Sequence, residues 1–410
     1  MTLWLRAERL FTGTGAMRRG GACVAVEGGR IGAVSAGTAP PQPQADDSVV
    51  TVAGGTILPG FIEAHTHLHC SGSLHAYADV MGDSLQTALL RAAVALRTLL
   101  GAGVTTARDL GSKPEVIFPL REAVQRGIAP GPHLIVAGAP LTTTGGHFHF
   151  MGGEADSVDE LLRVLRQQVK AGADFIKIMA TGGALTPNTN TRRAQFGLPA
   201  LRAVVEEGRR LERAIVAHCH ATEGIRAAAA AGVSGIVHCS WLAPGGGLEY
   251  DPAAVDQMLQ HGIVVDPTLA VGYRAMMHAI EAGATGAPRE RYDLWQARLP
   301  YFREMLARGV PFIVGTDSGM PNTGFAEWAQ TPALFVRELG MAPLEAIAAG
   351  TSGAARALGI AEETGTLAAG KRADITIVRG DPETAIEALF AVDTVVRDGE
   401  LVKQDGRLLV

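Results

Sequence analysis

Short apolar runs, each followed by an amphipathic stretch, recur along most of the chain. From Phe61 onward the runs are rich in Val, Ile and Ala, and the stretches between them, such as SVDELLRVLRQQVKAGA, carry apolar residues at helical spacing. Near-continuous apolar strands that alternate with helices are typical of a parallel sheet covered on both faces. Repeated eight times, this pattern predicts a closed (β/α)8 barrel of the TIM type. The predicted strands span residues 61–69, 104–111, 132–140, 174–183, 214–220, 235–240, 263–269 and 311–319.

The two ends of the chain have a different sequence pattern, in which short runs of β-branched residues lie between glycine and aspartate turns. Three such runs lie in residues 1–57, and the same pattern returns in residues 365–410. A proline-rich segment at residues 37–47, GTAPPQPQADD, predicts an exposed loop. We therefore expect residues 1–57 and 365–410 to combine into a small composite β-sandwich beside a barrel that covers residues 58–364.

Composition and charge argue against several classes of protein. Of the 410 residues, 47% are hydrophobic and 19% are charged, which is typical of a folded globular chain. The net charge is -5 and no Lys/Arg-dense stripe occurs, so we expect no nucleic-acid partner. The sequence contains no uninterrupted apolar run of about 18 residues, so we expect no membrane-spanning helix. The start, MTLWLRAERLFTG, does not resemble a secretion signal, and the four cysteines are scattered, so we expect a cytoplasmic protein.

Histidines gather where the predicted strands end. Of the twelve histidines, eight lie at or just after the carboxyl ends of strands, the face at which barrel enzymes place their chemistry. His65 and His67 are two positions apart on the first strand, so both side chains point to the same face and can hold one metal ion. The eight residues are His65, His67, His69, His147, His149, His218, His220 and His238.

A lysine interrupts the fourth predicted strand, DFIKIMATGG. An unpaired ammonium group at Lys177 would be costly in a buried strand, so one interpretation pairs it with a neighbouring carboxylate. The other is a lysine of lowered pKa that adds carbon dioxide and bridges two metal ions as a carbamate. Histidines from three other strands favour the carbamate.

The remaining metal-compatible residues follow strands five, six and eight. His218 and His220 again share one face, whereas Cys219 between them should point toward the helical layer. His238 ends the sixth strand, and Asp317 in GTDSG can both ligate a metal and accept a proton from water. Histidine, carbamate and aspartate ligands suit zinc, with manganese and cobalt left open.

As a set, these and neighbouring motifs resemble the amidohydrolase superfamily, in particular its imidazolonepropionase-like enzymes, prolidase-like dipeptidases and carboxamide hydrolases. The similarity covers nearly the whole chain. It implies the barrel with its appended β-domain and a metal-dependent hydrolase of carbon–nitrogen bonds. The motifs are GGTILPGFIEAHTH (54–67), GVTTARDLG (103–111), TTGGH (143–147), FIKIMATGG (175–183), VAHCH (216–220), GTDSG (315–319), TSGAARALGI (351–360) and GTLAAGKRADITIV (365–378).

The resemblance also implies a role for each residue of the site. Two divalent metal ions would be bridged by Lys177 carboxylated on its Nζ, and a bridging hydroxide would attack the amide carbonyl. Asp317 would be the proton shuttle, and His147 would steady the carbonyl oxygen. His238 lacks the preceding glutamate that many relatives carry. His218 is taken as the ligand from strand five, which leaves His220 as a pocket residue. The implied metal ligands are His65, His67, Lys177, His218, His238 and Asp317.

Three other functions stay open. A mononuclear deaminase or imidazolone-type cyclic amide hydrolase would use His220 and Glu223 as a His-x-x-Glu pair and would need no bridging lysine. A lactonase or organophosphate hydrolase could use the same dinuclear centre. A catalytically inactive scaffold would have lost ligands that are all present here.

The substrate is less well specified by the sequence. We expect a small-molecule amide, such as a dipeptide, an N-acyl amino acid or a related carboxamide. Arg192 and Arg193, in the loop at residues 184–197, either clamp a substrate carboxylate or are solvated loop residues. Three apolar residues near other strand ends either form apolar walls of the pocket or belong to the core: Trp241, Leu242 and Met320. Relatives often assemble, so a homo-oligomer stays open.

Overall fold

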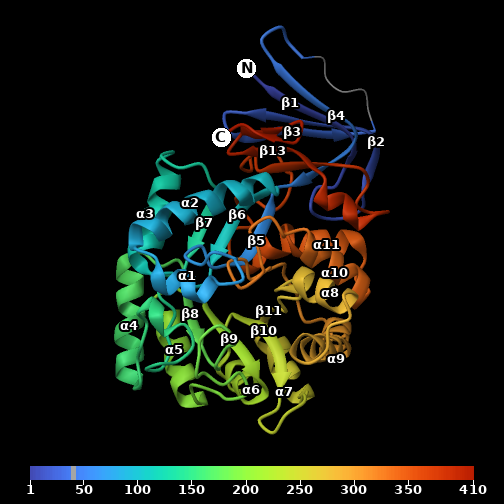
Figure 1. Ribbon diagram of the computed structural model, residues 1–410. Helices are drawn as coiled ribbons and strands as arrows, with labels where there is room; N and C mark the ends of the chain where they lie inside the picture. The colour runs from blue at the N-terminus through green and yellow to red at the C-terminus, as the bar shows by residue number, and fades with distance from the viewer. Residues whose placement is uncertain (38–42) are drawn as a thin grey trace.

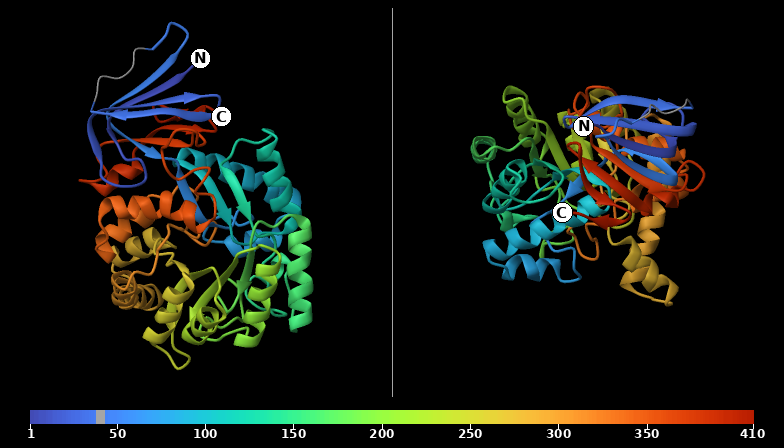
Figure 2. Two further views of the ribbon diagram at one scale, coloured as in Figure 1. Left: turned by 180° about the vertical axis from the view of Figure 1, so that it is seen from behind. Right: turned by 90° about the horizontal axis from the view of Figure 1, so that it is seen from above.

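The computed structural model describes residues 1–37 and 43–410. Residues 38–42, within the predicted proline-rich loop, lie outside the described residues. The terminal strands gather at one end of the molecule, where both chain ends lie, and the helices and remaining strands form the larger part (Figures 1 and 2). Among the residues that the structure describes, no helix is both long and apolar enough to cross a membrane.

The two ends of the chain form one mixed sheet. β4 pairs in parallel with β1 on one edge and antiparallel with β12 on the other, so the N-terminal and C-terminal segments are joined. The prediction that the ends combine is confirmed. This double pairing of β4 links all eight strands in the order β15-β14-β13-β12-β4-β1-β2-β3. The division of these strands into the two layers of a sandwich remains a prediction. The strands are β1 (Leu3–Leu10), β2 (Arg18–Glu27), β3 (Arg30–Ala36), β4 (Ser48–Pro59), β12 (Ile375–Arg379), β13 (Val392–Arg397), β14 (Glu400–Gln404) and β15 (Arg407–Leu408).

Seven parallel strands form two further sheets. One has the order β5-β6-β7 and the other β11-β10-β9-β8, so that strands adjacent in sequence are adjacent in space. These strands confirm the first seven predicted for the barrel, and their near-complete burial explains their apolar sequences. Their bounds are β5 (Phe61–Thr66), β6 (Val104–Asp109), β7 (His133–Val136), β8 (Ile176–Met179), β9 (Ile215–Ala221), β10 (Gly235–Leu242) and β11 (Val264–Asp266).

The eighth predicted strand, residues 311–319, makes isolated bridges in place of a regular strand. Val265 pairs with Phe312, and Thr66 pairs with Ser318. Between these bridges the Glu63 carboxylate accepts hydrogen bonds from the Thr316 amide at 3.0 Å and hydroxyl at 2.7 Å, so a side chain replaces part of the backbone ladder. A further bridge from Leu141 to Ile178 joins the other edges of the two parallel sheets. The sheets are thus linked at both edges, as a barrel requires.

Helices separate the parallel strands and pack on their outer faces. α4 shows how the sequence sets one of them: Ser157 and Glu160 form a reciprocal capping box, and Gly172 ends the helix in the left-handed conformation. The helices are α1 (Ala76–Gly82), α2 (Leu85–Gly101), α3 (Pro114–Gln125), α4 (Val158–Ala171), α5 (Leu198–Arg210), α6 (Thr222–Ala231), α7 (Pro252–His261), α8 (Tyr273–Glu281), α9 (Ala287–Ala307), α10 (Gln330–Leu339), α11 (Pro343–Ala349) and α12 (Ser352–Ala357), with 3-10 turns η1 (His149–Met151) and η2 (Ile386–Phe390).

Candidate active site

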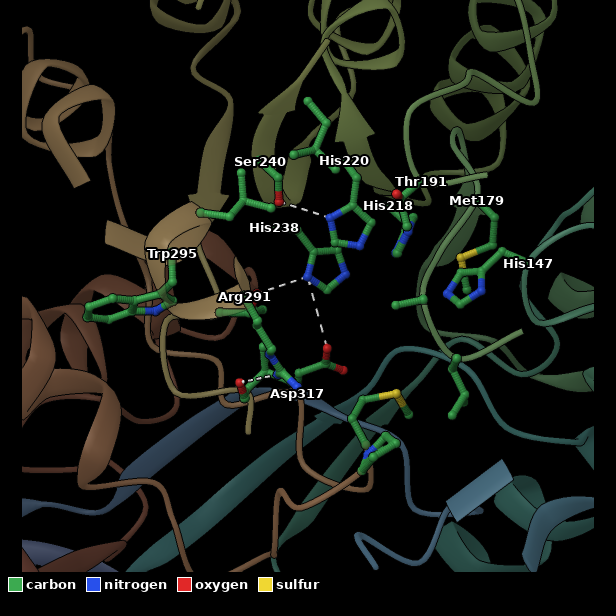
Figure 3. A pocket seen from close by; sticks show the side chains of 18 of the residues that line it. His147, Met179, Thr191, His218, His220, His238, Ser240, Arg291, Trp295 and Asp317 are labelled. Atoms are coloured by element: carbon green, nitrogen blue, oxygen red, sulfur yellow. Dashed lines mark hydrogen bonds and ion pairs between the residues drawn. The ribbon is translucent and has the colours of Figure 1, made fainter. Parts of the chain in front are cut away.

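A cavity of about 450 Å³ lies at the carboxyl ends of the parallel strands (Figure 3). A space of this size holds a small organic molecule. Five of the predicted histidines and the predicted aspartate line it, while His65 and Lys177 lie fully buried at 0% and 1% exposure. The lining residues from the predicted set are His67, His147, His218, His220, His238 and Asp317.

His65 and His67 extend from the end of β5 with fixed ring orientations. His65 Nδ1 is 2.8 Å from the Asp266 carboxylate, and His67 Nδ1 donates to the Gly111 carbonyl at 2.9 Å. These bonds place the proton on Nδ1 and leave the Nε2 lone pair available, the usual arrangement of a metal-ligating histidine. Both Nε2 atoms point toward Asp317 Oδ1, at 3.3 Å and 3.4 Å.

Lys177 projects from β8 into the same cluster. Burial lowers the pKa of Lys177 to about 7, although Asp317 partly opposes the shift. Within residues 1–37 and 43–410, its Nζ has no hydrogen-bond partner and no ion pair within 4.0 Å. Lys177 therefore does not form the carboxylate pair that was one interpretation of its sequence.

Asp317 is held as a carboxylate by its neighbours. Burial acts to raise the pKa of Asp317, but the neighbouring His65, His67 and Lys177 lower it to about 2. Its backbone has a φ of 62°, a conformation that is rare outside glycine and is often found at functional sites. An aspartate in this environment is ionised at neutral pH.

Three histidines from β9 and β10 form a second group. The ligand atoms of His218, His220 and His238 lie within 4.8 Å of one another, and those of His65, His238 and Asp317 do so as well, so His238 belongs to both groups. Burial lowers the pKa of His220 to about 3 and the pKa values of His218 and His238 well below their usual range, which makes all three neutral imidazoles.

The rings of this second group are also oriented by hydrogen bonds. His218 Nε2 donates to the Gly182 carbonyl at 3.2 Å, which leaves Nδ1 as its free lone pair. His238 Nδ1 lies 2.9 Å from the Thr268 hydroxyl. β10 changes its register with β9 between His238 and Leu242. Both β9 histidines face the cluster, while Cys219 between them is buried in the core.

His147 enters from the loop before η1. Its Nδ1 is 3.0 Å from the Thr186 hydroxyl, and its backbone amide donates to Gln195 at 2.7 Å. Gly183 makes room for the ring, because a Cβ atom there would come within 2.3 Å of His147 Nε2. The ring centroid lies 4.5 Å from that of His218, so His147 lies beside the β9 histidines.

Arg192 and Arg193 are not among the residues that line the cavity. Arg192 turns away and donates to the carbonyls of Ala243 at 2.9 Å and Gly247 at 2.8 Å. His69 and His149, two of the eight gathered histidines, also lie outside the lining. Of the three predicted wall residues, Leu242 and Met320 line the cavity, whereas Trp241 belongs to the hydrophobic core.

Several site residues could not be singled out from the sequence by motif alone. Asp266 orients His65 from the end of β11, and Ser240 lies 2.9 Å from His220 Nδ1. Arg291 and Arg298 line the cavity from α9. The spacing of seven residues between these arginines, with Trp295 between them, is a signal that places them on one helix face.

The residues present fit a metal centre. His65 Nε2, Lys177 Nζ and Asp317 Oδ1 are buried, and none has a hydrogen-bond partner in the part of the chain that the structure describes. Neutral imidazole nitrogens and a carboxylate oxygen are ligands that zinc and related divalent ions prefer. A partner shared by these atoms would remove the cost of burying them unpaired.

The fold and the site define a class: α/β enzymes with a histidine-rich cavity at the carboxyl ends of parallel strands. Residues 56–402 match the amidohydrolase family, and the chain belongs to that family. It is a hydrolase that acts on carbon–nitrogen bonds. The resemblance inferred from the motifs is thereby confirmed.

Individual relatives agree with this assignment. The chain is 29% identical over 388 residues to an ochratoxinase of Aspergillus niger, with 85% of this chain and 76% of that protein covered. It is 25% identical over 406 residues to an imidazolonepropionase of Mycolicibacterium smegmatis, with 93% and 91% covered. The crystal structure of a Xaa-Pro dipeptidase with methionine bound in its active site is similar with a TM-score of 0.86 at 26% identity, covering 98% of this chain and 100% of that one.

Proposed function

We propose that the chain is a dinuclear metal-dependent amidohydrolase that cleaves the amide bond of a dipeptide, an N-acyl amino acid or a related carboxamide. The observation that carries the proposal is the buried trio of His65 Nε2, Lys177 Nζ and Asp317 Oδ1, none of which has a hydrogen-bond partner among residues 1–37 and 43–410. The similarity to a Xaa-Pro dipeptidase supports the choice of a peptide-like amide.

Two divalent ions, most suitably zinc, supply a water of lowered pKa and polarise the scissile carbonyl when bound. His65 and His67 would hold one ion, and His218 and His238 the other. Lys177 would connect the two ions. Because its pKa is about 7, a fraction of the protein molecules carry it as a neutral amine at neutral pH. That amine can add carbon dioxide, which forms a carbamate and releases a proton.

Two other side chains would act on the substrate directly. Asp317, which also contacts the first pair of histidines, would take the proton of the attacking water and pass it to the leaving nitrogen. His147 would donate a hydrogen bond to the carbonyl oxygen as negative charge develops there. His220, 2.9 Å from the Ser240 hydroxyl, would border the substrate.

We also propose that residues 311–319 complete an eight-stranded closed barrel within residues 58–364. The bridges at Phe312 and Ser318 support this, since they connect the segment to β11 on one side and β5 on the other. Residues 1–57 and 365–410 would then form the appended β-domain.

The rival mononuclear mechanism finds less support. It requires Glu223 beside the metal as the acid of the His-x-x-Glu pair. Glu223 is not among the cavity-lining residues, and its carboxylate accepts a hydrogen bond from the Ala194 amide. The similarity to an imidazolonepropionase keeps this reaction as the alternative.

Metal analysis tests the proposal. Protein reconstituted with zinc and bicarbonate, then freed of unbound ions, should contain about two zinc ions per chain by mass spectrometry. It should then hydrolyse members of a panel of dipeptides and N-acyl amino acids. One ion per chain would support the mononuclear alternative, and no bound ion would support an inactive scaffold.

A further inference from the structure

One wall of the cavity is a single face of α9. Four residues at intervals of three or four positions share this face, as helical geometry requires. In the close view, Arg291 and Trp295 lie across the cavity from His147 and Met179 (Figure 3). The wall residues are Arg291, Leu294, Trp295 and Arg298.

The two arginines of this wall have no acidic partner. Arg298 Nη1 donates to the Ser240 hydroxyl at 2.8 Å, and Arg291 Nη2 donates to the Val271 carbonyl at 3.0 Å. In the described ranges 1–37 and 43–410, neither guanidinium has an ion pair within 4.0 Å, and Arg298 Nε has no hydrogen-bond partner. By contrast, Arg289 on the same helix pairs with Asp293 at 2.9 Å.

Two like charges are therefore held beside a cavity without compensation. Burial, together with the charge of Arg291, lowers the pKa of Arg298 to about 10, so it is still a cation at neutral pH. Gly272 permits the approach of Arg291, because a Cβ atom there would come within 2.5 Å of its Nη2. Guanidinium groups in this setting bind carboxylates strongly, through paired and charge-assisted hydrogen bonds.

The position of Arg298 relates it to the reacting bond. Ser240 contacts both Arg298 and His220, so one hydroxyl group separates the guanidinium from the histidine cluster. In an N-acyl amino acid, only the α-carbon separates the amide nitrogen from the carboxylate. A substrate whose amide lies at the histidines can thus present its carboxylate to Arg298.

We propose that Arg298 and Arg291 form a subsite for the free α-carboxylate of the substrate's amine portion. This inference rests on the proposed amidohydrolase function and takes the place of Arg192 and Arg193 as the carboxylate clamp.

The surroundings of the subsite select apolar substituents. Trp295 uses its Nε1 to donate to the Leu269 carbonyl at 3.1 Å, so it offers the cavity only its apolar ring. Leu294, Val271, Phe148 and Met179 add further apolar side chains to the lining. The substrate class is therefore an N-acyl amino acid or dipeptide with apolar side chains and a free carboxylate.

Matched acids and amides test the subsite. The substrates are the N-benzoyl derivatives of phenylalanine, leucine, methionine and proline, each as the free acid and as the neutral carboxamide. For the zinc-loaded wild type we expect kcat/KM to favour the best acid over its carboxamide by at least about ten-fold. Arg298→Met should lower that ratio by about 10–100-fold, mainly through a higher KM for the acid, because a charge-assisted hydrogen bond contributes about 1.5–3 kcal/mol.

Two variants control for indirect effects. Arg289→Met removes a surface arginine of the same helix and should leave the ratio unchanged. Arg298→Lys keeps the charge but not the paired geometry, so its ratio should fall between those of the wild type and Arg298→Met. Circular dichroism and zinc content establish that each variant is folded and loaded.

The outcomes separate this inference from the proposed function. For pairs that are not hydrolysed, calorimetric titration replaces kinetics. An unchanged acid-to-amide ratio in Arg298→Met, with amides still cleaved, overturns the subsite and leaves the proposed function standing. Acid-selective binding that depends on Arg298, without any cleavage, supports the subsite and contradicts the proposed function. A panel that is neither bound nor cleaved overturns the subsite.

Discussion

Two clusters of histidine and aspartate have similar spacing but lie at opposite ends of the parallel strands. One contains His65, His238 and Asp317 at the carboxyl ends, and the other contains His133, Asp374 and Asp398, where His133 is the first residue of β7. In each cluster the ligand atoms lie within 4.8 Å of one another. Spacing alone would therefore make both of them metal sites.

Their partners differ. In the amino-end cluster, Arg372 Nε binds Asp374 at 2.6 Å, and Arg397 and His133 each lie 3.3 Å from Asp398. The positive charges that a metal would bring are thus already supplied by arginines. In the described part of the chain, Asp317 Oδ1 and His65 Nε2 of the carboxyl-end cluster and His133 Nε2 of the amino-end cluster are all buried without hydrogen-bond partners. No arginine of the described residues forms an ion pair with Asp317, so only the amino-end cluster is compensated by arginines.

If the proposed function holds, charge compensation by arginines, more than residue type or spacing, distinguishes the amino-end cluster from the carboxyl-end cluster. A buried group that is fully paired stabilises the fold, whereas one left unpaired costs free energy that only a ligand can recover. The clusters should therefore respond in opposite ways to substitution.

The largest effect is expected at Lys177. Lys177→Ala should abolish zinc binding at the bridged site and lower kcat/KM by at least about 10³-fold, corresponding to about 4 kcal/mol of transition-state stabilisation. The unfolding midpoint of the metal-free protein should not fall, because the change removes an unpaired buried amine. Inductively coupled plasma mass spectrometry, kinetics and thermal unfolding measure the three quantities.

A chemical rescue sharpens this test. Added formate or propionate should restore part of the activity of Lys177→Ala, because a small carboxylate can replace the carbamate. Lys170→Ala, in the last turn of α4, is the matched control and should behave as the wild type. Full activity in Lys177→Ala would contradict the bridging role.

The amino-end cluster should give the opposite result. Asp374→Ala leaves the Arg372 guanidinium, the Thr364 hydroxyl and the Asp398 amide without their acceptor. We expect the free energy of unfolding, measured by urea denaturation, to fall by about 3 kcal/mol. Zinc content should not change.

An exposed ion pair provides the comparison for this variant. Asp256→Ala breaks the surface pair with Arg308 and should lower the free energy of unfolding by less than about 1 kcal/mol. If Asp374→Ala instead lost zinc at unchanged stability, the assignment of the two clusters would have to be reversed.

Much of the fold follows from hydrophobic patterning, and its failures have local causes. The apolar runs give seven parallel strands because burial on both faces leaves little room for polar residues. Residues 311–319 have the same apolar pattern but make isolated bridges, and between these bridges Thr316 donates hydrogen bonds to the Glu63 carboxylate. The strand order at the chain ends could not be predicted from local pattern, because the pairing of β4 with β12 depends on contacts distant in sequence.

The site residues likewise divide into those that local periodicity predicts and those that it does not. Alternation along strands brings His218 and His220 to one cavity, since the period of two is a local property. Arg192 and Arg193 were expected near the substrate from loop position alone, and the path of a loop is not fixed by periodicity. Arg298 lies in the site instead, because a helix places residues seven positions apart on one face. Metal ligation by the predicted residues and the domain boundaries remain predictions.

The smallest effect concerns the pH dependence of the amino-end cluster. The neighbouring His133, with help from Arg397 and Arg372, lowers the pKa of Asp398 below its usual 3.8, although burial opposes the shift. A carboxylate of lowered pKa stabilises the fold at pH values above the unfolded value, and the contribution is lost as the pH falls through the folded value. Because Asp398 is 43% exposed, the contribution should be less than about 1 kcal/mol.

Asp398→Asn should therefore unfold at a slightly lower temperature than the wild type at pH 6, and the difference should vanish near pH 2.5. Asp405→Asn, in the turn between β14 and β15, is the control; an equal difference at both pH values would show that the ion pairs of Asp398 do not contribute.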